Sequence, residues 1–156
     1  MNTNLKISKK MTKQELDYAH SKLNMEYTKK SNDINRRKDD VSREKLNQLL
    51  AIRMETAAKK DEIRTNIEML RNERLKYERD TLLHNEISEK IRIQENRIAR
   101  LKEQADIEAA QVHGNAYATR LQLDYEARQL SEWLEAEKLR INEAFLQEHY
   151  NEELLG

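Results

Sequence analysis

Residues 84–112 read HNEISEKIRIQENRIARLKEQADIEAAQV, and they carry the clearest periodic pattern in the chain. Two sets of positions recur every seven residues: His84, Ile91, Ile98, Ala105 and Val112 form the first, and Ile87, Gln94, Leu101 and Glu108 form the second. Side chains at this spacing share one side of an α-helix and occupy the a and d positions of a coiled coil. We therefore predict a coiled-coil oligomer seam made of Ile87, Ile91, Ile98, Leu101, Ala105 and Val112. Polar residues at two d positions leave the number of helices in the coiled coil unspecified.

The composition favours helix on both sides of this stretch. The 156 residues include no proline, no cysteine and two glycines, while 37% of them are charged and 5% are aromatic. Proline and glycine are the residues that most often interrupt helices, so few signals end a helix once it has begun. Strong helix formers such as Leu, Glu, Lys and Arg dominate the sequence. We predict an all-α protein built on a long amphipathic helix, with neither disulfides nor a thiolate zinc site.

The helix boundaries follow from a small number of capping signals. Residues 1–11 have no period and are predicted to be a flexible basic arm, after which Thr12 and Glu15 form a capping box. Residues 12–112 are then predicted to form one long helix with the coiled-coil seam, or two helices. The second possibility arises because the polar stretch around residues 31–40 is a candidate break.

Gly114, in the sequence His113-Gly114-Asn115, is the best candidate for a hinge. Glycine ends many helices because it readily adopts the left-handed conformation, and asparagine can cap the helix that follows. We predict a break near Gly114, after which a helix over residues 116–150 folds back on the preceding one as a helical hairpin. In the alternative, Gly114 is a tolerated residue inside a continuous helix.

The helix predicted over residues 116–150 is the most aromatic part of the chain. Its apolar side chains lie on two stripes, which indicates contacts with more than one neighbour. We predict that it anchors the chain to a partner through Tyr117, Leu121, Tyr125, Leu130, Trp133, Leu134, Ile141 and Phe145. The same side chains are also consistent with packing inside the hairpin, and both interpretations stay open.

Charge is unevenly distributed although the formal net charge is zero. Residues 1–45 contain 12 basic and 7 acidic side chains, whereas residues 103–156 contain 4 basic and 12 acidic ones. Such a gradient favours folding back, with the acidic C-terminal helix beside the basic residues of 79–102, or head-to-tail pairing of separate molecules. It is equally consistent with a solvated surface whose composition drifts along the chain.

No arrangement of residues is typical of a catalytic or metal site. The four histidines, His20, His84, His113 and His149, do not pair at a spacing of three or four, which two imidazole ligands on one helix face require. Carboxylates on extended helices have no dry cleft that would shift their pKa values. We expect no enzyme activity, no cofactor and no metal.

The spread of charge and apolar residues also argues against nucleic-acid and membrane partners. Acidic residues interrupt the basic residues of 1–45 and dilute the positive surface that phosphates require. No apolar run approaches the ~20 residues that cross a bilayer, and we see no secretory signal. We expect a soluble intracellular protein, located in the cytoplasm or in a particle, such as a virion, that assembles there.

These expectations favour a structural function. The first hypothesis is a non-enzymatic assembly protein, an oligomeric coiled-coil element of a larger particle such as a phage virion, fibre, collar or scaffold. Its partners would be further copies of itself, other protein subunits of the assembly, or both. The alternative is a coiled-coil regulatory or adaptor module whose C-terminal helix docks on one protein target. A helical nucleic-acid-binding protein is the lower alternative.

Overall fold

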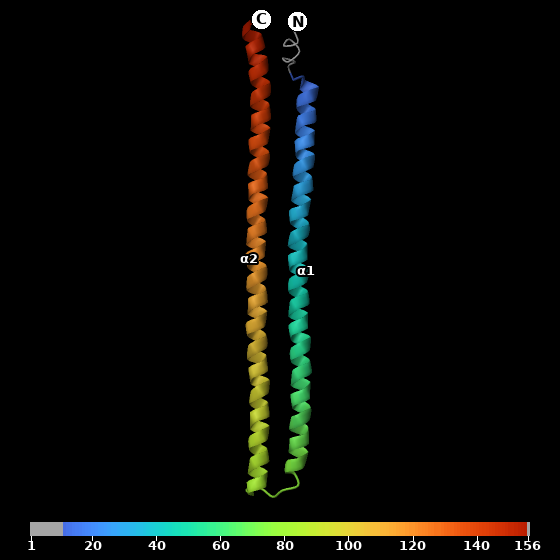
Figure 1. Cartoon of the computed structure of the whole chain (residues 1–156), viewed down its shortest axis with the longest axis vertical. Coiled ribbons are helices and arrows are strands. Elements are labelled where there is room, and N and C mark those ends of the chain that lie inside the picture. Colours follow the sequence, from blue (N-terminus) through green and yellow to red (C-terminus); the bar gives the residue numbers. More distant parts are fainter. Residues whose placement is uncertain (1–10, 156) are drawn as a thin grey trace, which may run out of the picture. The chain divides into compact units, whose positions relative to one another are not determined.

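The computed structural model describes residues 11–155 and contains two helices in that part of the chain. Helix α1 spans Lys13–Arg74, helix α2 spans Leu82–Leu155, and residues 75–81 connect them (Figure 1). The two helices pack against each other as a helical hairpin. The predicted all-α hairpin is therefore confirmed, although it turns at a different place. All of the predicted arm except Met11 lies outside the described residues.

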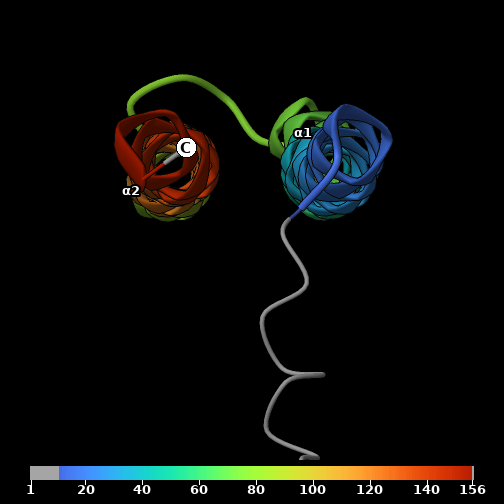
Figure 2. The ribbon, with the colours of Figure 1, turned by 90° about the horizontal axis from the view of Figure 1, so that it is seen from above.

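The chain divides into two compact units, which we call unit 1 and unit 2. Unit 1 combines residues 1–39 with residues 120–156, and unit 2 comprises residues 40–119. Each unit therefore contains a piece of α1 and a piece of α2, and unit 2 also contains the turn. Figure 2 shows the two helices end-on, with no third layer covering either of them in the described part of the chain.

A threonine side chain caps the start of each helix. Thr12 Oγ1 accepts a 3.1 Å hydrogen bond from the backbone N–H of Glu15, as its place in the capping box predicts. Thr81 Oγ1 accepts a 3.2 Å hydrogen bond from the backbone N–H of His84 in the first turn of α2. Each contact satisfies one of the N–H groups that the start of a helix leaves unpaired.

The turn at residues 75–81 contains neither glycine nor proline. The Tyr77 N–H donates to the Arg74 carbonyl at 3.1 Å, and the Thr81 N–H donates to the Glu78 carbonyl at 3.4 Å. Asp80 has a φ of 66°, in the left-handed region that aspartate tolerates better than most residues. One left-handed aspartate followed directly by a threonine cap thus reverses the chain.

Unit 2 contains a buried cluster close to this turn. Ile63 and Ile67 of α1 and Ile87 and Ile91 of α2 form it, and each of them is at most 7% exposed. Four half-buried side chains pack against the cluster: Leu70, Tyr77, Ile98 and Leu101. The buried residues of unit 1 are Leu23, Ile34, Leu123 and Leu134. The apolar core of each unit is therefore a narrow strip between two helices.

Burial follows two different spacings along the helices. On α2, buried or half-buried residues lie alternately three and four positions apart from residue 84 to residue 112, and again from residue 123 to residue 141. Such positions also recur every eleven residues over longer stretches: Leu23, Ile34, Lys45, Thr56 and Ile67 on α1, and Leu101, Val112, Leu123, Leu134 and Phe145 on α2. Eleven residues in three turns give ~3.67 residues per turn, which is close to the ~3.6 of an undistorted α-helix. This spacing keeps one side of each helix against its neighbour with little winding.

Gly114 does not interrupt the helix, and the prediction of a hinge there is wrong. Helix α2 runs through Gly114 without a break, and the φ of this glycine is not positive. A glycine inside a helix costs only about 1 kcal/mol relative to alanine. The half-buried residues on either side, Val112 and Ala116, continue the buried stripe, and that packing outweighs the glycine penalty.

The other predicted boundaries change accordingly. The optional break around residues 31–40 is absent, because α1 is continuous there. The segments predicted over 12–112 and 116–150 are replaced by the two helices on either side of residues 75–81. A fold at Gly114 would have left most of the first helix uncovered, whereas the turn near the middle of the chain covers the stripe of α1 with α2.

Candidate interaction surfaces

The oligomer seam predicted in α2 faces α1 of the same chain. Ile87 and Ile91 are each 5% exposed and lie in the buried cluster of unit 2. The remaining seam residues are half-buried on the same stripe: Ile98, Leu101, Ala105 and Val112. Their role between chains stays a prediction. Because α1 already covers this stripe, a contact between copies has to use other side chains.

The predicted anchor residues of α2 fall into two groups. Five are buried or half-buried in the pairing of the helices: Leu130, Trp133, Leu134, Ile141 and Phe145. The other three, Tyr117, Leu121 and Tyr125, are each at least 50% exposed. The first group thus packs within the hairpin, and the second is free to contact a neighbour.

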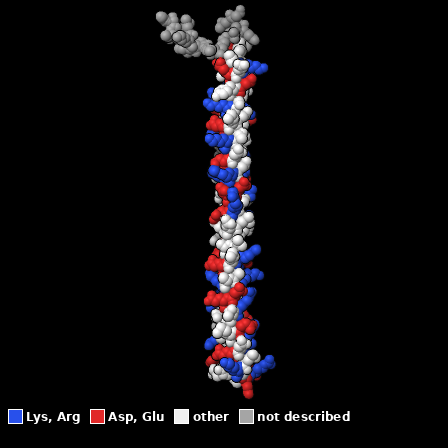
Figure 3. Space-filling view, turned by 90° about the vertical axis from the view of Figure 1, so that its right-hand side faces the viewer, with Lys and Arg blue, Asp and Glu red and all other residues white. Residues whose placement is uncertain are grey.

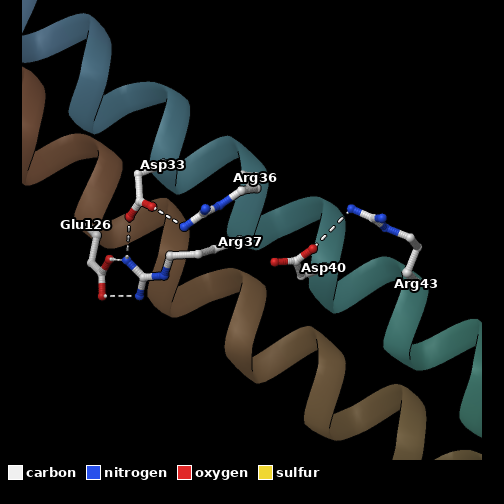
Figure 4. Close-up of polar contacts among 6 residues, drawn as sticks. All are labelled: Asp33, Arg36, Arg37, Asp40, Arg43 and Glu126. Carbon is white, nitrogen blue, oxygen red and sulfur yellow. Dashed lines mark hydrogen bonds and ion pairs between the residues drawn. The ribbon is translucent and has the colours of Figure 1, made fainter.

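Among the described residues of unit 1, two ion pairs connect α1 to α2. The Arg37 guanidinium donates to both carboxylate oxygens of Glu126, at 2.8 and 3.3 Å (Figure 4). Lys38 is ion-paired with Asp124, two residues before Glu126 on α2. The acidic C-terminal helix therefore lies beside the basic residues 11–39, and the predicted placement beside residues 79–102 is wrong. The reason is that the turn lies at 75–81 and not at Gly114.

These ion pairs shift the pKa values of their members in the direction that favours the charged forms. The hydrogen bond to Glu126 raises the pKa of Arg37. The hydrogen bond from Lys38 lowers the pKa of Asp124, and the positive charges of Lys38, Arg120 and Arg128 act in the same direction. The side chains of Arg37 and Asp124 are 44% and 53% exposed, so solvent screens both pairs. Their main effect is to fix the register of the two helices.

Polar contacts also join the start of α1 to the end of α2 in unit 1. The Met11 backbone N–H donates a 3.0 Å hydrogen bond to Glu148 Oε2. His20 Nε2 lies 2.8 Å from Asn142 Oδ1. Figure 1 shows these two helix ends side by side. The contacts extend the antiparallel pairing of unit 1 to the start of α1 and the last turns of α2.

One open groove in unit 1 combines aromatic and charged side chains. It has a volume of about 1090 Å³, and its apolar lining is formed by Ile34, Tyr125, Leu130 and Trp133. The Lys30 ammonium lies 4.6 Å from the centroid of the Trp133 ring, a cation–π contact. The groove is suited to an apolar side chain of a partner, held between aromatic rings and charged rims.

The two sides of unit 2 differ in how their charges are used. On one side, Arg71 is ion-paired with Glu68 on its own helix at 3.3 Å and with Glu95 of α2 at 3.5 Å. On the other side, an open hollow of about 490 Å³ is lined by Asn66, Met69, Leu70, Glu73, Lys90, Ile93 and Gln94. None of the charged residues in this hollow has an ion pair within the described part of the chain.

Comparison of the chain with protein-family models, with curated proteins and with solved structures finds no match. Among residues 11–155, no group of three or more His, Cys, Asp or Glu side chains is placed to hold a metal ion. No helix in this range is long and apolar enough to cross a membrane.

The apolar spacing of the sequence predicts that Leu46 and Leu50 belong to one drifting stripe of α1, but both side chains point outward. Together with Met54 they recur every four residues, and each of the three is more than 50% exposed. The heptad template assigns such residues to a drifting buried stripe, whereas the 11-residue spacing turns them outward. Figure 3, in which α1 faces the viewer, shows Lys and Arg interspersed with Asp and Glu and separated by uncharged surface. This face offers uncharged patches between mixed charges and not a continuous basic stripe.

Proposed function

We propose that the chain is a non-enzymatic assembly protein, a coiled-coil hairpin that associates with further copies or other subunits of a larger particle. Such a particle would be a phage virion, or an assembly to which the chain contributes a fibre, collar or scaffold. The observation that carries this proposal is the balance of apolar residues in the described part of the chain. Eight hydrophobic side chains are buried there, whereas seventeen large ones are exposed. Contiguous exposed apolar surface is typical of interaction sites.

Coiled-coil packing is supported by the spacing of the buried positions. Alternating steps of three and four near the turn follow the heptad pattern, and the 11-residue recurrence is the other common coiled-coil period. Two paired helices bury one stripe each, so a stripe on the opposite side of either helix can contact a further helix. Leu46, Leu50 and Met54 form such a stripe on α1 within unit 2.

The test is the mass of the purified chain in solution, measured by light scattering during size exclusion, with circular dichroism on the same fractions. We expect a highly helical dimer or larger species whose mass increases with concentration. A chain that stays monomeric up to several hundred micromolar would contradict self-assembly. If such a monomer is also poorly helical, the fold would have to be completed by a different protein.

An adaptor function is the second candidate, and the groove of unit 1 favours it. The exposed ring of Tyr125 and the half-buried Trp133 form a site where an apolar side chain of one target could insert. In that case Tyr125→Ala should abolish binding of a purified target while circular dichroism stays unchanged. Leu146→Ala, an exposed position on the same helix outside the groove, is the matched control. Equal loss of binding in both variants would remove the groove from consideration.

A further inference from the structure

We propose that a second copy of the chain docks on the side of unit 2 that carries Met69 and Ile93. The result is a two-fold dimer of hairpins in which α1 of each copy lies against α2 of the other. This inference rests on the proposed function, because it names the surface and the arrangement through which copies assemble.

The docking surface has an apolar centre close to the turn. Met69 of α1 is 65% exposed and Ile93 of α2 is 47% exposed, and both line the same hollow of about 490 Å³. The half-buried Leu70 and Gln94 form its floor. An uncovered apolar side chain on each of two neighbouring helices, with a hollow between them, fits the side chains of another helix pair.

Charged residues flank this centre on both helices. Glu73 and Lys90 line the same hollow as Met69 and Ile93. Glu62 precedes Met69 by seven residues, and Arg100 follows Ile93 by seven residues. Seven residues are almost two helical turns, so Glu62 and Arg100 lie on the same side as the centre, farther from the turn. We call Glu62, Met69, Glu73, Lys90, Ile93 and Arg100 the turn-proximal face.

The charges of the turn-proximal face separate by helix. Its α1 residues, Glu62 and Glu73, are acidic, and its α2 residues, Lys90 and Arg100, are basic. Glu86 and Arg97 lie on the same side of α2 and carry opposite charges, so this side of α2 stays basic. None of the four charged side chains of the turn-proximal face makes an ion pair within the described part of the chain. On the opposite side of unit 2, by contrast, the Arg71–Glu95 pair joins the two helices at 3.5 Å. The charges of the turn-proximal face are therefore available to another molecule.

The separation of charge selects one of the two symmetric ways of packing this face on itself. A two-fold axis parallel to the helices sets α1 of one copy against α2 of the other, so that acidic residues meet basic ones. A two-fold axis across the helices sets α1 against α1 and α2 against α2, so that like charges meet. In the first arrangement, Met69 of each copy also lies opposite Ile93 of the other. Apolar and ionic complementarity thus agree on the same dimer.

Charge reversal tests the arrangement. The variant Glu62→Lys/Glu73→Lys makes both helices of the face basic, and the variant Lys90→Glu/Arg100→Glu makes both acidic. We expect each variant alone to dimerise at least about 100-fold more weakly than the wild type, because like charges then meet. An equimolar mixture should recover the affinity, because a basic face meets an acidic one. Sedimentation equilibrium gives the dissociation constants, and circular dichroism confirms that helicity is kept.

A matched control changes the same charges on the other side of α1. Asp61→Lys/Glu68→Lys carries the same charge change as the first variant, and both side chains are exposed. Asp61 and Glu68 directly follow the half-buried Lys60 and the buried Ile67, and they therefore project away from the turn-proximal face. Dimerisation of this control should stay within about threefold of the wild type.

Cysteine cross-linking tests the contact itself. The chain has no cysteine, so introduced thiols have no background. Under mild oxidation, a mixture of Met69→Cys and Ile93→Cys chains should form a disulfide-linked dimer, and each variant alone should form little. Cross-linking of either variant alone at the level of the mixture, or an affinity that the charge variants leave unchanged in a dimeric wild type, overturns this face. A wild type that never dimerises contradicts the proposed self-assembly as well.

Discussion

Gly114 illustrates how a residue-scale signal can be present without its usual consequence. A Cβ atom added at this position would meet no atom within 4 Å, and the residue is helical. Replacing it by alanine should therefore lower the conformational entropy of the unfolded chain without creating a clash.

We expect Gly114→Ala to increase the free energy of unfolding by about 1 kcal/mol. Urea unfolding followed by circular dichroism measures the change. Ala118→Gly, at another exposed position of α2, should cost a similar amount and serves as the inverse control. A Gly114→Ala variant less stable than the wild type would indicate that the glycine is needed in a non-helical conformation.

For the predicted seam residues, the sequence reveals which side chains are buried but not which surface covers them. That Ile87 and Ile91 belong to a buried stripe follows from their spacing, and both are buried. Which surface covers them does not follow, because a stripe on one helix is equally satisfied by a second chain or by the same chain. The sequence pattern could therefore predict the buried residues of α2 but not that α1 is their neighbour.

At the scale of elements, the turn depends on two residues that are individually weak signals. Asp80 tolerates the left-handed conformation and Thr81 is a favourable helix cap, but both residue types are also common elsewhere in the chain. Neither glycine nor proline marks residues 75–81, whereas Gly114 marks a position that stays helical. Packing of the long apolar stripes, which no local signal encodes, decides where the chain reverses.

Thr81 should make a measurable contribution as the cap of α2. We expect Thr81→Ala to lower the free energy of unfolding by about 1 kcal/mol, because the His84 N–H loses its 3.2 Å acceptor. Thr81→Ser keeps the hydroxyl and should stay close to the wild type. Thermal unfolding of the three proteins makes the comparison. Equal losses in both variants would mean that the methyl group, and not the cap, is what matters.

The ion pairs between α1 and α2 in unit 1 predict a dependence on acid pH. The hydrogen bond from Lys38 holds the pKa of Asp124 below its usual 3.8. Because the pKa is lower in the folded chain than in the unfolded one, the carboxylate stabilises the fold above about pH 3.8. That contribution is lost as the pH falls through the folded pKa.

We therefore expect Asp124→Asn to have a lower Tm than the wild type at pH 7, and the difference to vanish towards pH 2. High salt should reduce the difference at pH 7, because the pair is exposed. Glu132→Gln, an exposed change on the same helix at a residue without an ion pair in the described chain, is the control. A difference between Asp124→Asn and the wild type that persists at pH 2 would exclude the ion pair as its cause.

At the scale of the whole molecule, the sequence predicts the all-α hairpin. It predicts the spacing of the buried residues along the helices only in part. The scarcity of glycine and proline and the excess of helix formers favour long helices, and the acidic and basic segments favour folding back. Steps of three and four coincide with buried or half-buried residues from 84 to 112 and from 123 to 141 on α2. They fail at the end of the second stretch, where the half-buried residue is Phe145 and not Ala144. An undistorted helix has ~3.6 residues per turn, so 11-residue steps accumulate less drift than heptads.

The same distribution of burial predicts that stability is uneven along the chain. Unit 2 packs Ile63, Ile67, Ile87 and Ile91 into one contiguous cluster, whereas the four buried residues of unit 1 do not form such a cluster. Local opening requires the least free energy where few apolar contacts hold a segment. Amide hydrogens near the cluster, in residues 60–70 and 85–95, should therefore exchange more slowly than those in residues 15–30 and 135–150.

We expect this protection to differ by about 10–100-fold, measured by hydrogen exchange with mass spectrometry. Self-association through the turn-proximal face would add protection to the same segments, so the measurement has to be repeated on Glu62→Lys/Glu73→Lys. A gradient that persists in this variant arises from packing within the hairpin. A gradient that disappears would assign the protection to the contact between copies. Uniform protection in the wild type would mean that the helices separate in a single step, and the buried cluster would then not act as a local centre of stability.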